Sequence, residues 1–257
     1  GRIIVSRATL GPLDATTRPS PLHAAPQTDF DEVAEAYDES LPAHVVEHYL
    51  VKRLAFIREH TRPGPTLDLG CGTGVLAERV AEAGYAVTPL DPFRGMLRVL
   101  GRRRPDLPAI QASGIRLPFP DGAFALTYCI AVMHHVAEPA AVRQTLMEMA
   151  RVTQVGGHVL VWDHNPRNPY WPLLMRRVPQ DTGAERLIPE QEILDGLAAG
   201  GARPLVVKPL GLVPDFAPRP LLPLAAGMER LVERMPVLNR LCAHNVVLAV
   251  KDGQPAI

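Results

Sequence analysis

The segment LDLGCGTG, residues 67–74, places three glycines at alternate positions directly after a short apolar stretch. Glycine has no Cβ, so such a loop can turn sharply and bring its backbone close to a ligand. A helix is predicted over residues 75–83, and the amides at a helix N-terminus favour a negatively charged ligand group. Asp91 follows 17 residues after Gly74, at the end of the next predicted strand, where a carboxylate can accept hydrogen bonds from ribose hydroxyls. The segment therefore predicts a nucleotide-type site at a strand-to-helix turn.

Outward from this loop, strand and helix patterns alternate between residues 66 and 162. Such alternation predicts a parallel, doubly wound α/β sheet. Strands are predicted over residues 66–69, 85–90, 109–112, 124–130, 158–162, 205–208 and 245–251, a turn at Gly156-Gly157, and helices over 29–41, 43–60, 75–83, 93–103, 139–151, 189–199 and 224–235.

The composition limits what the protein can be. With 257 residues, 47% apolar and 21% charged, the chain suits one large α/β domain and is not disordered over most of its length. It contains 27 basic and 27 acidic residues, whereas proteins that bind nucleic acid through its backbone usually have a basic excess. No apolar run reaches the roughly 18 residues of a membrane-spanning helix. Three scattered cysteines indicate a reducing cytoplasm rather than a disulfide framework.

Three further segments accompany the glycine-rich loop: LDPF at 90–93, LPFPDGAF at 117–124, and an RV-to-GGHVLV segment within 151–161. Together they resemble the class I methyltransferases that depend on S-adenosylmethionine (SAM), over about residues 30–161. The glycine spacing differs from a dinucleotide Gly-x-Gly-x-x-Gly, so NAD fits less well. The resemblance implies a Rossmann-like, doubly wound, seven-stranded sheet of order 3-2-1-4-5-7-6 with helical cap elements. It also implies SAM as cofactor and S-adenosylhomocysteine (SAH) as its product.

The resemblance also assigns cofactor-binding roles. Tyr37 matches a position that reaches the methionine carboxylate, and Asp91 matches the acidic residue that binds ribose. At the position where the family often has an Asp that bonds the adenine amino group, this chain has Ser113, and the Ile115 backbone could read adenine instead. The cofactor-binding residues implied in this way are Tyr37, Asp68, Gly70, Cys71, Gly72, Gly74, Asp91, Pro92, Met96, Ser113, Gly114, Ile115 and Cys129.

The candidate catalytic residues follow two predicted strands. His134 and His135 come after the strand at 124–130, which the resemblance places beside the transferred methyl group. A hydroxyl acceptor needs a general base, and the pKa of histidine lies near working pH. Asp163 and His164 follow the strand at 158–162, where they could orient that base or contact the acceptor. The alternative is that these residues cap a helix or satisfy their own turn.

His44 and His48 lie four residues apart on a predicted helix and so share a face. Together with His134 and His135 they could form a metal site, as in methyltransferases that chelate a catecholic acceptor. A half-exposed helix face explains the pair more simply, so we expect no metal.

The segments outside the glycine-loop region suggest the acceptor. We expect an N-terminal arm at 1–28, a helical cap at 29–62, and a SAM-binding domain at 63–257 with lid insertions at about 164–188 and 209–244. Apolar lid residues suit a hydrophobic or aromatic small molecule, although core packing would also explain them. They are Tyr49, Tyr170, Trp171, Leu173, Leu174, Met175, Leu212, Phe216, Leu221, Leu222, Leu224 and Met228.

The expected function is therefore cytoplasmic methyl transfer from SAM to a small molecule, in natural-product biosynthesis, by a monomer or homodimer. O-methylation is the favoured reaction, and N- or C-methylation is close behind it. Ser113, and Ala125 in place of the family's usual Asp, leave open a non-methylating cyclase or a SAM-binding module on the same fold. Nucleic acid is not an expected substrate, because no motif with an aromatic residue for stacking on a flipped base is present.

Overall fold

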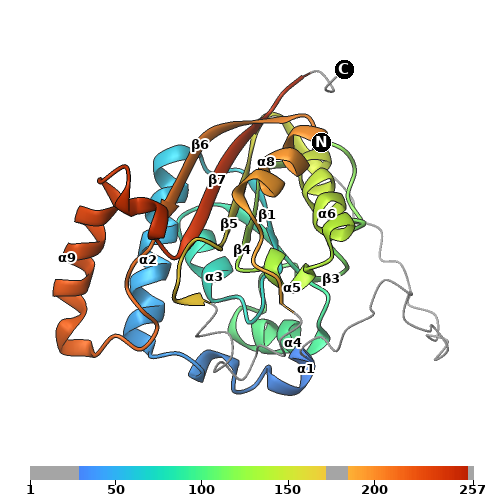
Figure 1. Cartoon of the computed structure of the whole chain (residues 1–257). Helices are drawn as coiled ribbons and strands as arrows, with labels where there is room; N and C mark the ends of the chain where they lie inside the picture. The colour runs from blue at the N-terminus through green and yellow to red at the C-terminus, as the bar shows by residue number, and fades with distance from the viewer. Residues whose placement is uncertain (1–28, 172–184, 254–257) are drawn as a thin grey trace.

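The computed structural model describes residues 29–171 and 185–253, and within them seven strands form one sheet (Figure 1). The strand order is β3-β2-β1-β4-β5-β7-β6, which confirms the predicted topology. The strands are β1 (Pro65–Leu69), β2 (Ala86–Asp91), β3 (Ile110–Gln111), β4 (Phe124–Ile130), β5 (Thr153–His164), β6 (Ala202–Leu210) and β7 (His244–Lys251). The principal helices are α1 (Phe30–Val33), α2 (Ala43–His60), α3 (Val75–Glu82), α4 (Arg94–Arg103), α5 (Met133–Val136), α6 (Pro139–Val152), α8 (Glu190–Ala199) and α9 (Leu222–Glu233).

Strands β3, β2, β1, β4 and β5 pair in parallel, and β7 runs antiparallel between β5 and β6. The carboxyl ends of the parallel strands therefore meet at one edge of the sheet. Ligands of open α/β sheets bind at this edge, near the point where the strand order reverses. Here that point lies between β1 and β4.

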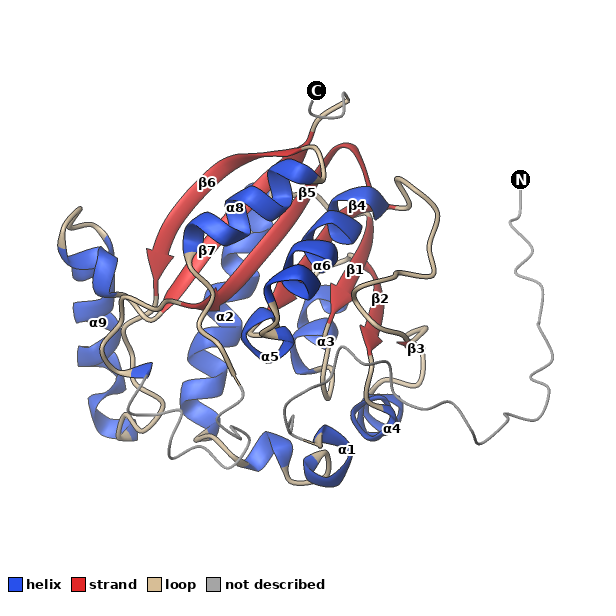
Figure 2. Cartoon of the chain, turned by 45° about the vertical axis from the view of Figure 1, so that its right-hand side comes forward, coloured by secondary structure: helices blue, strands red, loops and turns tan. Residues whose placement is uncertain are grey.

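Both faces of the sheet are covered by helices, which explains why its strands are apolar nearly throughout. Successive residues of a strand point to opposite faces. In β5, Val159 and Val161 belong to the cluster that contains α6 and α8, whereas Leu160 and Trp162 belong to the cluster that contains α2 and α3. Figure 2 shows α6 and α8 in front of the sheet and α2 and α3 behind it.

Two predicted elements differ from the structure. The helix expected over 29–41 is divided into α1 and a short 3-10 turn, Tyr37–Glu39. Asp29 caps α1 as expected, and Phe30 turns inward to pack on Met96 of α4. The turn expected at Gly156-Gly157 lies instead inside β5, as an irregularity in its pairing with β4.

The segment after β6 is tied to α2 by a buried carboxylate. Glu229 of α9 is 1% exposed and accepts hydrogen bonds from Lys52 (2.5 Å) and from the amide of Leu212 (2.6 Å), and His48 lies 3.0 Å away. The cap helix and the segment at 209–233 are thus fixed to each other beside the site. Of the helices in the described part of the chain, none is long and apolar enough to cross a membrane.

Candidate active site

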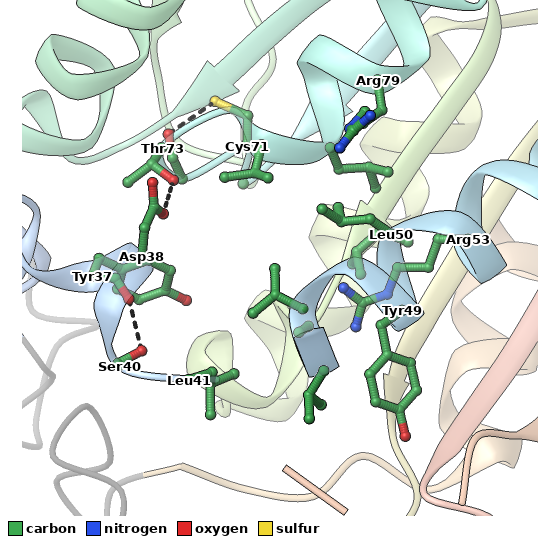
Figure 3. A pocket seen from close by; sticks show the side chains of 18 of the residues that line it. Tyr37, Asp38, Ser40, Leu41, Tyr49, Leu50, Arg53, Cys71, Thr73 and Arg79 are labelled. Carbon is green, nitrogen blue, oxygen red and sulfur yellow. Dashed lines mark hydrogen bonds between the residues drawn. The ribbon is translucent and has the colours of Figure 1, made fainter. Parts of the chain in front are cut away.

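A cavity of about 770 Å³ opens at the carboxyl ends of β1, β4 and β5 (Figure 3). The glycine-rich loop forms one wall, α2 forms the opposite wall, and a group of histidines closes the end near β5 and β7. Of the predicted site residues, those that line it are Tyr37, Asp68, Gly70, Cys71, Gly72, His134, His135 and His164.

The three glycines of the loop all have positive φ angles, and they differ in the space that a Cβ would have. At Gly70 (φ 72°) a Cβ would lie 2.5 Å from a methyl of Val132, and at Gly74 (φ 82°) it would lie 2.6 Å from Leu100. At Gly72 (φ 53°) a Cβ would meet no atom within 4 Å. Packing therefore requires glycine at the two outer positions, whereas the middle one presents bare backbone to the cavity.

Asp91 holds this loop in place. Its two carboxylate oxygens accept hydrogen bonds from the amides of Gly72 and Phe93, both at 2.9 Å. Burial raises the pKa of Asp91, and the two amide bonds oppose that shift. A carboxylate oxygen can accept more than one hydrogen bond, so ribose hydroxyls can still be bound here.

The remaining predicted cofactor residues surround the loop without lining the cavity. Pro92 and Ser113 are exposed, Gly114 and Ile115 are half-buried, and Met96 is covered by Phe30. Cys129 is fully buried in the core. Their roles toward adenine remain predictions.

Asp68 and Cys71 face the cavity from the end of β1 and the start of the loop. Burial raises the pKa of Asp68 to about 7 and raises that of Cys71 well above its ordinary value. Asp38, next to Tyr37, lies against the loop and accepts a hydrogen bond from the hydroxyl of Thr73 at 2.5 Å. This bond, drawn in Figure 3, holds the cap against the glycine-rich loop.

His134 and Asp163 form a buried pair. The Nδ1 atom of His134 lies 2.8 Å from Asp163 Oδ1, and the side chains are 4% and 0% exposed. Asp163 also accepts hydrogen bonds from the amides of Met133 and His164, both at 2.7 Å. Burial alone would raise the pKa of Asp163, but His134 and the two amides together lower it. Asp163 is therefore a carboxylate that directs the Nδ1 proton of His134 toward itself and places the basic lone pair on Nε2.

The backbone around His134 adopts unusual conformations. Ala131 and Ala137, which flank α5, both have φ 57°, a value that residues other than glycine rarely adopt. Ala131 also donates its amide to the carbonyl of Trp162 at 2.8 Å, which ties the loop after β4 to β5. These constraints fix the short helix that carries the histidine pair.

The neighbouring histidines are neutral. Burial, and then the nearby His134, lower the pKa of His135 to about 3 and that of His164 well below its ordinary range. Burial, followed by the charge of Arg53, lowers the pKa of His244 to about 3. Both histidines predicted as base lie near a buried carboxylate. His134 Nδ1 lies 2.8 Å from Asp163 Oδ1, whereas His135 Nδ1 lies 4.0 Å from Glu185 Oε1.

His134, Asp163 and His164 place potential metal-binding atoms within 4.8 Å of one another. However, the rings of His134 and His164 are stacked, with centroids 4.1 Å apart and planes inclined by 18°. A metal binds a histidine lone pair in the plane of the ring, so two stacked rings do not converge on one ion. The group is better suited to proton transfer than to metal binding.

His44 and His48 do not join this group. His44 Nε2 lies 2.7 Å from the carbonyl oxygen of Ala217, and His48 contacts Glu229. Both helix histidines thus bond to the segment at 209–233 and are not brought together with His134 and His135.

The predicted lid residues divide into two groups. Tyr49 and Trp171 line the cavity, whereas Phe216 and Leu224 are 67% and 64% exposed and do not. Leu221 and Met228 are also exposed, and Tyr170 and Leu212 line a smaller cavity of about 320 Å³ nearby. Leu173, Leu174 and Met175 lie outside the described residues.

The polar cavity residues that sequence reasoning missed include Arg53 on α2, Asp215 after β6, and His244 at the start of β7. One signal was available, since Arg53 lies four residues after Tyr49 and so falls on the inward face of the helix. His244 and Asp215 come from distant segments, and no local pattern marks them.

Comparisons with known proteins relate the chain to methyltransferases. A family profile described as a methyltransferase domain matches residues 67–161. Two proteins named demethylmenaquinone methyltransferase, from Paenarthrobacter aurescens and Renibacterium salmoninarum, are each 34% identical to this chain over 164 residues. The matched part covers 58% of this chain and 64% and 68% of theirs, so the chain spans about two thirds of the length of these curated relatives.

Solved structures share the fold. A Thermotoga maritima protein described as a SAM-dependent methyltransferase, possible histamine N-methyltransferase, matches with a TM-score of 0.64 at 16% identity, over 87% of this chain and 98% of that one. The 4+2 cyclase SpnF matches with a TM-score of 0.55 at 20% identity, over 78% of this chain and 80% of that one. At such low identity these matches concern the fold alone.

Proposed function

Because the chain belongs to the class I SAM-dependent methyltransferases, we propose that it transfers a methyl group from SAM to a small hydrophobic or aromatic acceptor, with His134 as general base. The observation that carries the proposal is the position of His134, which is paired with the buried Asp163 and lines the same cavity as the glycine-rich loop. Quinone methylation by the relatives named above supports an aromatic acceptor.

The residues present fit SAM. Gly72 offers backbone to the cavity where a Cβ would meet nothing within 4 Å, and the neighbouring amides begin helix α3. Asp68 provides a carboxylic acid facing the cavity, and Asp91 lies at the end of β2 where the ribose is expected. When bound, SAM supplies an electrophilic methyl group on a sulfonium.

The protein's own part in the reaction is to position the acceptor and remove its proton. Asp163 orients the imidazole of His134 and stabilises the imidazolium that forms when Nε2 takes a proton. A hydroxyl acceptor needs this proton removal, which is why O-methylation is the preferred proposal. The same base could activate a phenol for methylation at a ring carbon, or an amine, so C- and N-methylation follow closely.

The wider setting is part of the same proposal. We place the enzyme in natural-product biosynthesis in the cytoplasm, where Cys71, Cys129 and Cys242 would remain reduced thiols. The segments at 29–62 and 209–244 would act as the cap and lid of the acceptor site, with Tyr49 and Trp171 as its aromatic walls.

The test is transfer of labelled methyl from SAM to 1,4-naphthoquinol as an aromatic dihydroxy probe. Replacing His134 with Ala should lower kcat by about 10²- to 10⁴-fold, the usual contribution of a general base. The matched control is His60→Ala, a remote histidine of α2, which should leave kcat unchanged. Methyl transfer that survives His134→Ala undiminished would contradict the assigned base. Conversion of the probe without incorporation of labelled methyl would instead favour the repurposed, non-methylating alternative.

A further inference from the structure

Arg53 brings a positive charge into the acceptor side of the cavity. It lies on the third turn of α2, one turn after Tyr49, and lines the cavity. In Figure 3 its guanidinium projects from the helix toward the open centre. The side chain is held between two aromatic rings, with Cζ 5.5 Å from the ring centroid of Tyr49 and 6.0 Å from that of Trp162.

This guanidinium is unpaired within residues 29–171 and 185–253. Its Nε atom is buried without a hydrogen-bond partner, and the side chain forms no ion pair there. Burial raises the pKa of Asp215 and the nearby charge of Arg53 opposes that shift, although the two described side chains form no ion pair. Burial in turn lowers the pKa of Arg53 itself.

Such an arrangement is costly unless a ligand completes it. Arg53 is half-buried, but its Nε is fully buried, and a buried donor without a partner is unfavourable; the two contacting rings compensate only in part. A guanidinium has a rigid fork of donors that matches two oxygens of a carboxylate or one strongly negative oxygen. The cavity is therefore complementary to an oxygen anion at this point.

We propose that Arg53 binds an anionic oxygen of the methyl acceptor: a carboxylate, a phenolate or an enolate. The proposal rests on the proposed function and narrows its substrate class from hydrophobic small molecules to those that carry an acidic oxygen. An aromatic body would contact Tyr49 and Trp171, and its acidic oxygen would face Arg53.

The methionine carboxylate of SAM has the same chemistry, but the surroundings favour the acceptor. The groups whose pKa the Arg53 charge lowers include His164 and His244, at the ends of β5 and β7. At the glycine-rich loop, burial, Tyr128 and Asp91 set the pKa of Asp68, with no contribution from Arg53. Arg53 contacts the ring of Trp162, the residue before Asp163, which places it beside the proposed base; Tyr37 and Asp163 both lie near enough to oppose the lowering of its pKa by burial.

The test compares 2-naphthoate with its uncharged analogue 2-naphthamide, titrated into the purified protein with and without SAH. The variants are Arg53→Met, which keeps the apolar stem and removes the charge, and Arg53→Lys, which keeps the charge without the fork. Arg58→Met on the exposed side of the same helix is the matched control. Thermal unfolding of each variant reports on folding.

The wild type should bind 2-naphthoate at least tenfold more tightly than 2-naphthamide, and Arg53→Met should abolish this preference. Arg53→Lys should retain part of it, Arg58→Met all of it, and the SAH affinity of all three should stay within twofold of wild type. The melting temperature of Arg53→Met should not fall, because the substitution removes a buried Nε donor that has no partner in the described part of the chain.

Three results would overturn the proposal. The first is a wild type without preference for the naphthoate. The second is an Arg53→Met variant that still prefers 2-naphthoate to 2-naphthamide. The third is an Arg53→Met variant that binds SAH tenfold more weakly while keeping this preference, which would assign Arg53 to the cofactor carboxylate. A wild type that does not bind SAH would refute the proposed function instead, and the comparison without SAH would still report on Arg53.

Discussion

Replacing Gly72 with Ala separates a role in ligand binding from a role in folding. A Cβ at this position would meet no protein atom within 4 Å, so the only cost to the fold is the backbone conformation at φ 53°. A left-handed conformation costs an L residue about 1–2 kcal/mol relative to glycine. For a chain of this size, about 1 kcal/mol shifts the melting temperature by about 2–4 °C. Gly72→Ala should therefore melt about 2–8 °C below the wild type.

Gly72→Ala should weaken the binding of SAH more than the same substitution at Gly84 does. A methyl group that projects into the cofactor's place overpacks the contact, which costs about 1–3 kcal/mol. At about 1.4 kcal/mol per factor of ten, SAH should bind about 5- to 140-fold more weakly. Gly84, at the far end of α3, also has positive φ (93°) and no atom within 4 Å of a Cβ, but it does not line the cavity. Gly84→Ala should lower the melting temperature similarly and leave the SAH affinity within twofold.

Calorimetric titration with SAH and thermal unfolding of both variants provide the assay. If Gly72→Ala bound SAH as tightly as the wild type does, the glycine-rich loop would not be the cofactor cradle. If both variants lost affinity equally, the loss would reflect general destabilisation and the reasoning would also be refuted.

Two further predictions concern buried carboxyl groups. Because burial raises the pKa of Asp68 to about 7, this group is largely protonated below neutral pH, whereas the positively charged SAM favours its carboxylate. The affinity for SAM should therefore rise between pH 6 and pH 8 with release of a proton, and Asp68→Asn should remove this dependence; a flat wild-type profile in calorimetry would contradict it. Burial opposes ionisation of Glu229, but His48 and Lys52 prevail and lower its pKa to about 2, so its contribution to stability is complete above its ordinary pKa of 4.5 and is lost as the pH falls toward 2. Glu229→Gln should reduce the free energy of unfolding in urea at pH 7 by about 1.5–3 kcal/mol, the usual contribution of a hydrogen bond to a charged group, because Lys52 then keeps only Glu233 as an ionic partner among the described residues. A loss below about 1 kcal/mol would show that the segment at 209–233 does not depend on this contact.

The topology could be predicted from the sequence because each parallel strand carries its own local signal. The glycine loop between β1 and α3 fixes the first βα unit, and the apolar runs of β4 and β5 are bounded by turn residues. The predicted helix over 29–41 failed because tertiary contacts override local preference there. Phe30 packs on α4 while Asp38 bonds to Thr73, which divides the segment into two short turns.

The candidate site was only partly accessible to sequence reasoning. His134 and Asp163 were both found, since each follows a strand at the ligand-binding edge, but their pairing at 2.8 Å depends on the register of β4 with β5. Arg53 and His244 were missed because their meeting depends on the packing of α2 against β7, more than 190 residues apart in sequence. The only local signal for the two is the four-residue spacing of Arg53 from Tyr49, and no local pattern marks His244.

The most direct test of the central claim is calorimetric titration of the purified protein with SAM and SAH, repeated on Asp91→Ala. The wild type should bind both with dissociation constants on the order of micromolar. The substitution removes a buried carboxylate that holds Gly72 and faces the expected ribose, so it should weaken both by about 10- to 100-fold, since a hydrogen bond to a charged group contributes about 1.5–3 kcal/mol. Absence of heat with either ligand in the wild type would contradict the account.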